Sequence, residues 1–216
     1  MTLFDWISKF RPASANSLGW ISFQIGLFLF SSSAFISGLF LLLALFLGSL
    51  KRSASYWHDF WNYPLLIVTL LMIISSIHAY SGWLAWVGLA NWIPYFWGFW
   101  SFQVYLQTAE SRRRAAICLL AGTLPVLVTG FGQLWFGWHG PWKVLNGLII
   151  WFIAPGGQPV GRLSGLFDYA NIAGAWLAII WPFAFAALLQ NRISRLQRSL
   201  SLILAIGVVA ALFLTD

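Results

Sequence analysis

A long apolar run, Leu18–Leu50, limits what this chain can fold into more than any other feature, because it contains no Asp, Glu, Lys or Arg. As a single helix it would be about 50 Å long, whereas roughly 20 residues are enough to cross a bilayer. Three serines at positions 31–33 interrupt the run near its middle, where their hydroxyls can bond backbone groups that a turn sets free. The run therefore predicts two short helices, Leu18–Phe30 and Ala34–Leu50.

The rest of the chain is equally apolar, and the fold class that we predict is an all-α polytopic membrane protein. Hydrophobic residues make up 60% of the 216 positions and charged residues only 8%, with a mean hydropathy of +0.81. That is more apolar surface than a soluble domain of this size can bury. Five further spans are predicted, at Pro64–Ala79, Trp83–Leu106, Ala115–Phe131, Ile172–Leu189 and Leu200–Leu214. We expect about seven transmembrane helices in a single transmembrane domain, residues 1–216.

The distribution of Lys and Arg between these spans predicts their orientation. If the N-terminus is cytoplasmic, ten of the twelve basic residues fall on the cytoplasmic side. These ten are Lys9, Arg11, Lys51, Arg52, Arg112, Arg113, Arg114, Arg192, Arg195 and Arg198. The other two, Lys143 and Arg162, lie in a long segment, 132–170, that this topology places outside. The net charge of +7 does not indicate nucleic-acid binding, because a binder needs a continuous basic face.

The outer segment, 132–170, is predicted to lie against the membrane surface. Its stretch "GWHGPWKVLNGLIIWF", Gly137–Phe152, is too short to span and predicts a short interfacial helix. Four tryptophans would lie at headgroup depth, namely Trp135, Trp138, Trp142 and Trp151. Gly156 and Gly157 predict a turn rather than a phosphate loop, because no strand precedes them and no Lys-Ser pair follows.

No metal site and no cofactor are predicted. The three histidines, His58, His78 and His139, are far apart in the sequence and do not share one side of the predicted topology. The chain has neither a Cys pair nor a His-Glu helix motif, and a metal site needs several converging ligands. His139 does share the outer segment with Lys143 and Arg162, and all three are candidate substrate-binding residues.

The stretch "GRLSGLFDYAN", residues 161–171, leads into the apolar helix that follows it. Asp168 and Asn171 can cap the N-terminus of that helix, with Arg162 paired to Asp168 or to a lipid phosphate. Alternatively, Arg162 forms an anion site, because a guanidinium beside a helix N-terminus offers a bidentate fork and a positive dipole end. The residues alone leave both interpretations open.

The pattern Arg162-x-x-Gly165-x-Phe167-x-x-x-Asn171 resembles the Arg-x-x-Gly-x-Phe…Asn element of the O-antigen ligase and polymerase superfamily of bacterial inner membranes. The stretches "SSSAFISGLFLLLALFLGSL", "LANWIPYFWGFW", "GWHGPW" and "GLFDYANIAGAWLAIIWPF" are similar, more narrowly, to its cyanobacterial branch of inorganic carbon (bicarbonate) transporter-like proteins. The resemblance covers most of Leu18–Asp216. Family members often have His-Pro or Asn-Gln where this chain has Tyr169 and Ala170, so no role of a histidine there is carried over.

This resemblance implies a multi-pass protein of the inner (plasma) membrane that transfers a glycan from a polyprenyl-diphosphate carrier to an acceptor at the outer face. In that interpretation Arg162 and Asn171 are the catalytic residues, because fixed Arg donors stabilise charge on the departing diphosphate. Gly165 and Asp168 complete the substrate-binding set, and no general base is identified. Relatives are longer, so we expect this chain to be the N-terminal part of a larger bundle.

Two other functions remain open at this stage. Arg162 would suit bicarbonate as well as a diphosphate, so an inorganic carbon transporter is the first alternative. A carrier site is expected near the bilayer midplane, whereas Arg162 is predicted at the outer boundary. A non-catalytic membrane component is the second alternative. The expected partners are membrane lipids and either a polyprenyl-diphosphate-linked glycan or bicarbonate.

Overall fold

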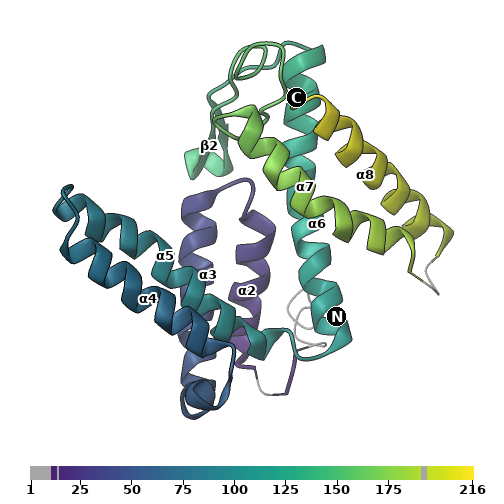
Figure 1. Ribbon diagram of the computed structural model, residues 1–216. Coiled ribbons are helices and arrows are strands. Elements are labelled where there is room, and N and C mark those ends of the chain that lie inside the picture. Colours follow the sequence, from purple (N-terminus) through teal and green to yellow (C-terminus); the bar gives the residue numbers. More distant parts are fainter. Residues whose placement is uncertain (1–10, 14, 191–193) are drawn as a thin grey trace. The chain divides into compact units, whose positions relative to one another are not determined.

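The computed structural model describes residues 11–13, 15–190 and 194–216, which are mostly helical (Figure 1). They form seven α-helices, α2 (Ser17–Leu29), α3 (Ala34–Arg52), α4 (Asn62–Ile77), α5 (Trp83–Ser101), α6 (Ala109–Trp135), α7 (Ala170–Leu188) and α8 (Arg195–Phe213). Each predicted apolar span corresponds to one of these helices, although several ends differ. The predicted cytoplasmic N-terminus with Lys9, and the basic residue Arg192, lie outside the described residues.

Three helices in the described part of the chain, α6, α7 and α8, are long and apolar enough to cross a membrane. Helices α2 and α4, and residues Ala34–Leu50 of α3, are apolar but shorter. The structure therefore supports an all-α membrane protein. That all seven helices cross the membrane stays a prediction, as does the orientation.

The chain divides into two compact units. Unit 1 comprises Met1–Gly26 and Gly38–Ala115, and unit 2 comprises Leu27–Ser37 and Ala116–Asp216. The turn between α2 and α3 thus belongs to the same unit as α7 and α8.

In unit 1, α2 and α3 form an antiparallel helical hairpin. A β-carbon at Gly26 would lie 2.6 Å from Cγ of Leu41, and one at Gly19 would lie 3.2 Å from Cβ of Leu47. Gly26, near the end of α2, thus lies beside Leu41, whereas Gly19, near the start of α2, lies beside Leu47 further along α3. The two helices therefore run in opposite directions. Glycine at both positions lets the helices approach closely.

Aromatic side chains fill the interior of unit 1. Trp20 and Tyr105 are completely buried, and Phe23 packs against Tyr105 with ring centroids 5.0 Å apart. Tyr105 belongs to a short 3-10 helix, η2 (Phe102–Tyr105), and its hydroxyl donates to the carbonyl oxygen of Ala44 at 2.7 Å. A buried tyrosine hydroxyl needs such a partner, so this bond fixes η2 against α3.

The predicted division of the first apolar run is confirmed. Helix α2 ends at Leu29 and α3 begins at Ala34, with the three serines between them. The Ser31 hydroxyl donates to the carbonyl oxygen of Gly122 at 2.6 Å, and the backbone N–H of Ser33 donates to the carbonyl oxygen of Leu29 at 2.8 Å. The Ser33 bond and the Ser32 hydroxyl, which donates to the same carbonyl oxygen at 3.4 Å, satisfy the backbone at the end of α2, while Ser31 joins the turn to α6.

In unit 2, α7 and α8 pack side by side along their length (Figure 1). The buried residues of α7 recur at spacings of three and four, which places them on one face of the helix. They are Ala170, Ala173, Leu177, Ile180 and Ala184. The core against this face also contains Ala205, Val208 and Ala211 of α8, together with Leu120, Leu127 and Leu163.

The predicted interfacial helix within Gly137–Phe152 is wrong. These residues form a short antiparallel β-hairpin, in which β1 (Trp142–Val144) and β2 (Ile149–Trp151) are joined by η3 (Leu145–Gly147). The physical reason is the Asn-Gly pair, since Asn146 has φ 57° and Gly147 has φ 88°. Positive φ at such a pair favours a hairpin turn and disfavours a continuous helix.

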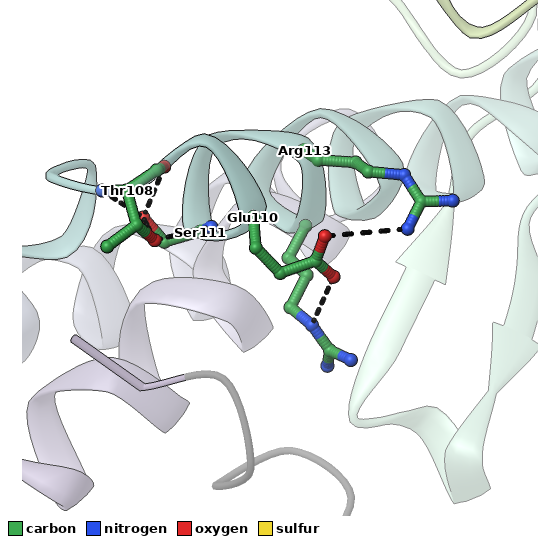
Figure 2. A network of polar contacts seen from close by, with 5 residues as sticks. Thr108, Glu110, Ser111 and Arg113 are labelled. Atoms are coloured by element: carbon green, nitrogen blue, oxygen red, sulfur yellow. Dashed lines mark hydrogen bonds and ion pairs between the residues drawn. The ribbon is translucent and has the colours of Figure 1, made fainter. Parts of the chain in front are cut away.

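The start of α6 is stabilised by the polar network shown in Figure 2. The backbone N–H of Ser111 donates to the Thr108 hydroxyl, and the backbone N–H of Thr108 donates to the Ser111 hydroxyl, both at 3.1 Å. Glu110 accepts from Nε of Arg114 at 3.3 Å and pairs with Arg113 at 3.6 Å. A carboxylate in the first turn complements the helix dipole and offsets the two arginines beside it.

Candidate functional site

The loop that carries the candidate site is fixed by a single buried side chain of α6, Gln133. Its Nε2 donates to the carbonyl oxygen of Ala154 at 2.7 Å and to the Ser164 hydroxyl at 3.1 Å. Its Oε1 accepts from the backbone N–H groups of Ser164 at 3.1 Å and Gly165 at 2.9 Å. One amide therefore holds two distant parts of the irregular segment, a role that the sequence analysis missed.

Gly165, a predicted substrate-binding residue, lies in a buried contact with α6. Its φ is +58°, and a β-carbon would lie 3.0 Å from the carbonyl oxygen of Val126 and 3.5 Å from the backbone nitrogen of Gly130. Glycine is favoured here both by the left-handed backbone and by the close approach. This contact positions the residues on either side of Gly165.

The predicted pair of Arg162 and Asn171 is in contact. Nη2 of Arg162 donates to Oδ1 of Asn171 at 2.8 Å, and Asn171 is the second residue of α7. Nε and Nη2 of Arg162 also donate to the carbonyl oxygen of Thr215, at 2.9 and 2.5 Å. The backbone N–H of Leu163 donates to the carbonyl oxygen of Leu214 at 2.6 Å. Arg162 thus connects the start of α7 to the end of α8, where carbonyl oxygens and the negative dipole end favour a cation.

The suggested helix cap by Asp168 is not formed. The N-cap residue of α7 is Tyr169, with extended backbone and no capping side-chain bond. The backbone N–H of Ala170 donates instead to the carbonyl oxygen of Gln158 at 2.8 Å. The alternative pairing of Asp168 with Arg162 is not formed either, since both ion pairs within the described residues involve Glu110. Asp168 is exposed, and its carboxylate is not engaged by the helix.

A pocket of about 460 Å³ lies beside Asp168, entirely within unit 2. Its walls come from the serine turn, from strand β2 with its flanking residues, and from the stretch that enters α7. Five aromatic residues line it, Phe30, Phe35, Trp151, Phe152 and Phe167. Its polar groups are Ser31, Ser32, Ser33 and Asp168, and the other lining residues are aliphatic.

The polar groups of this pocket differ in how far they are already engaged. The Ser31 hydroxyl bonds Gly122, and the Ser32 carbonyl oxygen accepts from Nε1 of Trp151 at 2.9 Å. The Ser33 hydroxyl and the Asp168 carboxylate make no hydrogen bond to another described side chain or backbone group. Ser33 and Asp168 are therefore the groups that a bound molecule can engage.

The other two candidate binding residues lie apart from these contacts. His139 is exposed, and its Nδ1 lies 3.0 Å from the carbonyl oxygen of Gly137. Lys143 is exposed on β1, opposite Ile150. Neither side chain contacts Arg162 or Asn171 through a hydrogen bond within the described part of the chain. Among the same residues, no group of three or more His, Cys, Asp or Glu could hold a metal ion.

Comparison with protein-family models, with curated proteins and with solved structures finds no match for this chain. The resemblance to the O-antigen ligase superfamily therefore depends on the sequence motifs alone.

Proposed function

We propose that this chain is an integral membrane protein that binds the diphosphate of a polyprenyl-linked glycan and takes part in transferring that glycan to an acceptor. The observation that carries the proposal is the state of the Arg162 side chain. Two of its nitrogens, Nε and Nη2, are held by Asn171 and Thr215, while Nη1 makes no hydrogen bond within the described residues. The guanidinium is thus oriented and still has two N–H donors for a ligand.

The charge of Arg162 also supports an anionic ligand. Its partners, a carboxamide oxygen and a backbone carbonyl oxygen, carry no formal charge. The positive charge therefore remains available to a ligand, and the guanidinium lies between the N-terminus of α7 and the C-terminus of α8. A diphosphate that leaves a sugar gains negative charge, and fixed donors of this kind stabilise such charge.

An inorganic carbon transporter is the competing function, since a bicarbonate ion can bind the same fork. The pocket lined by Phe167 and Asp168 favours the larger ligand. Its lining is mainly aromatic and aliphatic, which suits an apolar chain or the face of a sugar and offers a bicarbonate ion few polar partners. A polyprenyl-linked glycan offers an apolar chain and neutral sugars as well as its diphosphate.

The test is the affinity of the chain in phospholipid nanodiscs for undecaprenyl diphosphate. Arg162→Ala and Arg162→Lys should each weaken binding by about tenfold or more, since a lysine keeps the charge but loses the fork. The matched control is Arg198→Ala, which removes an exposed arginine of α8 and should leave the affinity unchanged.

Equal affinity of the Arg162 variants and the parent chain would overturn the proposal. Arg162-dependent uptake of labelled bicarbonate into proteoliposomes, without diphosphate binding, would support the transporter instead. Thermal unfolding of each variant, measured in the same nanodiscs, separates a lost ligand contact from a lost fold.

A further inference from the structure

We infer that the pocket between the serine turn, β2 and the start of α7 binds a saccharide ring, with Asp168 accepting hydrogen bonds from its hydroxyls. The source of this saccharide, the glycan of a lipid-linked donor, rests on the proposed function. The site itself depends on the residues that line the pocket.

The lining has groups that complement both kinds of surface on a sugar ring. A pyranose has a face of C–H groups and a rim of hydroxyls. Aromatic rings bury the apolar face, while a carboxylate accepts strong, charge-assisted bonds from the hydroxyls. The pocket provides Phe35, Trp151, Phe152 and Phe167 for the first and Asp168 with Ser33 for the second. Its volume of about 460 Å³ is within the range of small-molecule sites.

Part of the pocket wall is held in place by contacts within unit 2. Nε1 of Trp151 donates to the Ser32 carbonyl oxygen at 2.9 Å, which joins β2 to the serine turn. Phe30 and Phe167 both pack against Trp176 of α7, with ring centroids 5.5 and 6.5 Å apart. A site that is already ordered binds its ligand with little loss of conformational entropy.

The charge of Asp168 decides between a saccharide and other ligands. An acyl chain in this pocket would bring hydrocarbon against an unpaired carboxylate, which is costly. A phosphate or a bicarbonate ion would be repelled by it. A neutral ligand with several hydroxyl donors satisfies the carboxylate and still covers the aromatic wall.

The pocket and Arg162 also belong to one continuous stretch of the chain. Phe167, Asp168 and Ile172 line the pocket, while Arg162 and Asn171 form the cationic contact. Both groups of residues belong to unit 2. The cation suits the diphosphate, and the aromatic pocket with its carboxylate suits the sugar.

Saturation-transfer NMR on the full chain in nanodiscs tests this inference, because it detects weak binding and reports which protons contact the protein. The probe is a mixture of the methyl glycosides of glucose, galactose, mannose and N-acetylglucosamine, with glycerol as a non-sugar reference. We expect saturation of the ring protons of at least one glycoside. Nanodiscs are prepared without glycoside detergents, which would compete.

Two substitutions and a control locate the binding. Asp168→Asn should weaken glycoside binding by about tenfold, because bonds to a charged acceptor are replaced by bonds to a neutral one. Ser33→Ala should weaken it by a smaller factor of about threefold. Asp59→Asn, which neutralises a carboxylate of unit 1, should leave binding unchanged.

Saturation of none of the four glycosides above the glycerol reference would overturn the inference, as would equal saturation in the parent chain and Asp168→Asn. Undecaprenyl diphosphate is measured in the same nanodiscs. Diphosphate binding without glycoside binding would reject the saccharide pocket alone. Glycoside binding without Arg162-dependent diphosphate binding would reject the proposed function and leave the pocket standing.

Discussion

The helical hairpins α4–α5 and α7–α8 are both strongly apolar, yet only one of them has a packed face. In α7, five buried residues recur at spacings of three and four. In α4 the buried residue is Asn62. In α5 Leu89 is buried, together with Gly98, Trp100 and Ser101 near the C-terminal end. Hydrophobicity alone therefore does not distinguish a helix that packs on protein from one that remains exposed.

The difference lies in the size and spacing of side chains. Helix α7 has Ala at three of its five buried positions, and small residues let a neighbouring helix approach closely. Helices α4 and α5 expose large residues, among them Leu71, Trp83, Trp92 and Tyr95. A helix that is apolar on all sides is suited to lipid. We therefore expect the first hairpin to depend on surrounding lipid for its stability, whereas the second has a packed core of its own.

The first test concerns topology, namely the side of the membrane on which the turn of each hairpin lies. On the predicted topology the α4–α5 turn at Tyr80 and the outer residue His139 are outside, while Arg113 and the start of α8 at Arg195 are cytoplasmic. Single cysteines at these positions, in a Cys118→Ser background that removes the only native cysteine, should label accordingly with an impermeant maleimide. Labelling of His139→Cys only after the inner face is opened would invert the topology.

A large loss of stability should come from Gly122→Ala. A β-carbon at Gly122 would collide with the carbonyl oxygen of Phe28, which belongs to the backbone and cannot turn aside. Overpacking of this kind costs about 1–3 kcal/mol or more. The matched control is Gly88→Ala in α5, where nothing lies within 4 Å, and alanine there should stabilise by up to about 1 kcal/mol.

Thermal unfolding in detergent, followed by size-exclusion chromatography, measures both glycine variants. Opposite signs would confirm that unit 2 is packed at Gly122 and that α5 is open at Gly88. Equal behaviour of the two variants would contradict the contrast between the packed contact of α6 with Phe28 and the open face of α5.

A smaller loss is expected from Gln133→Ala. Removing the amide leaves the buried N–H groups of Ser164 and Gly165 without their acceptor, at a cost of about 1–3 kcal/mol. The comparison variant is Thr69→Ala in α4, because the Thr69 hydroxyl bonds only the Leu65 carbonyl oxygen of its own helix. Its unfolding temperature should change little. A Gln133 variant as stable as Thr69→Ala would show that the other bonds of the loop, such as those of Arg162 to Thr215, are enough to hold it.

The helices could be predicted from the sequence because their signals are local. The length of the run Leu18–Leu50 and the serines inside it were enough to locate the turn that begins after Leu29. The β-hairpin was missed because an apolar stretch of that length fits a helix or a strand, and its Asn146–Gly147 signal was not used.

The site was predictable in part. The contact of Arg162 with Asn171 follows a motif ten residues long, whereas the contact of Arg162 with Thr215 joins positions far apart in the sequence. The pocket depends on the serine turn meeting β2, through the bond of Trp151 to Ser32. Nothing in either local stretch indicates the other, so only the folded chain brings them together.

The smallest expected effect separates the structural role of Arg162 from its proposed function. Asn171→Asp places a carboxylate against the guanidinium and in the first turn of α7, where the helix dipole favours it. The variant should be more stable than the parent chain by about 0.3–1 kcal/mol. The same carboxylate neutralises Arg162, so undecaprenyl diphosphate should bind about tenfold more weakly. Thermal unfolding and nanodisc binding on one preparation measure the two effects, with Asn171→Ala as the control that removes the contact without adding charge. A variant that gains stability and keeps full affinity would show that Arg162 connects α7 to α8 and does nothing more.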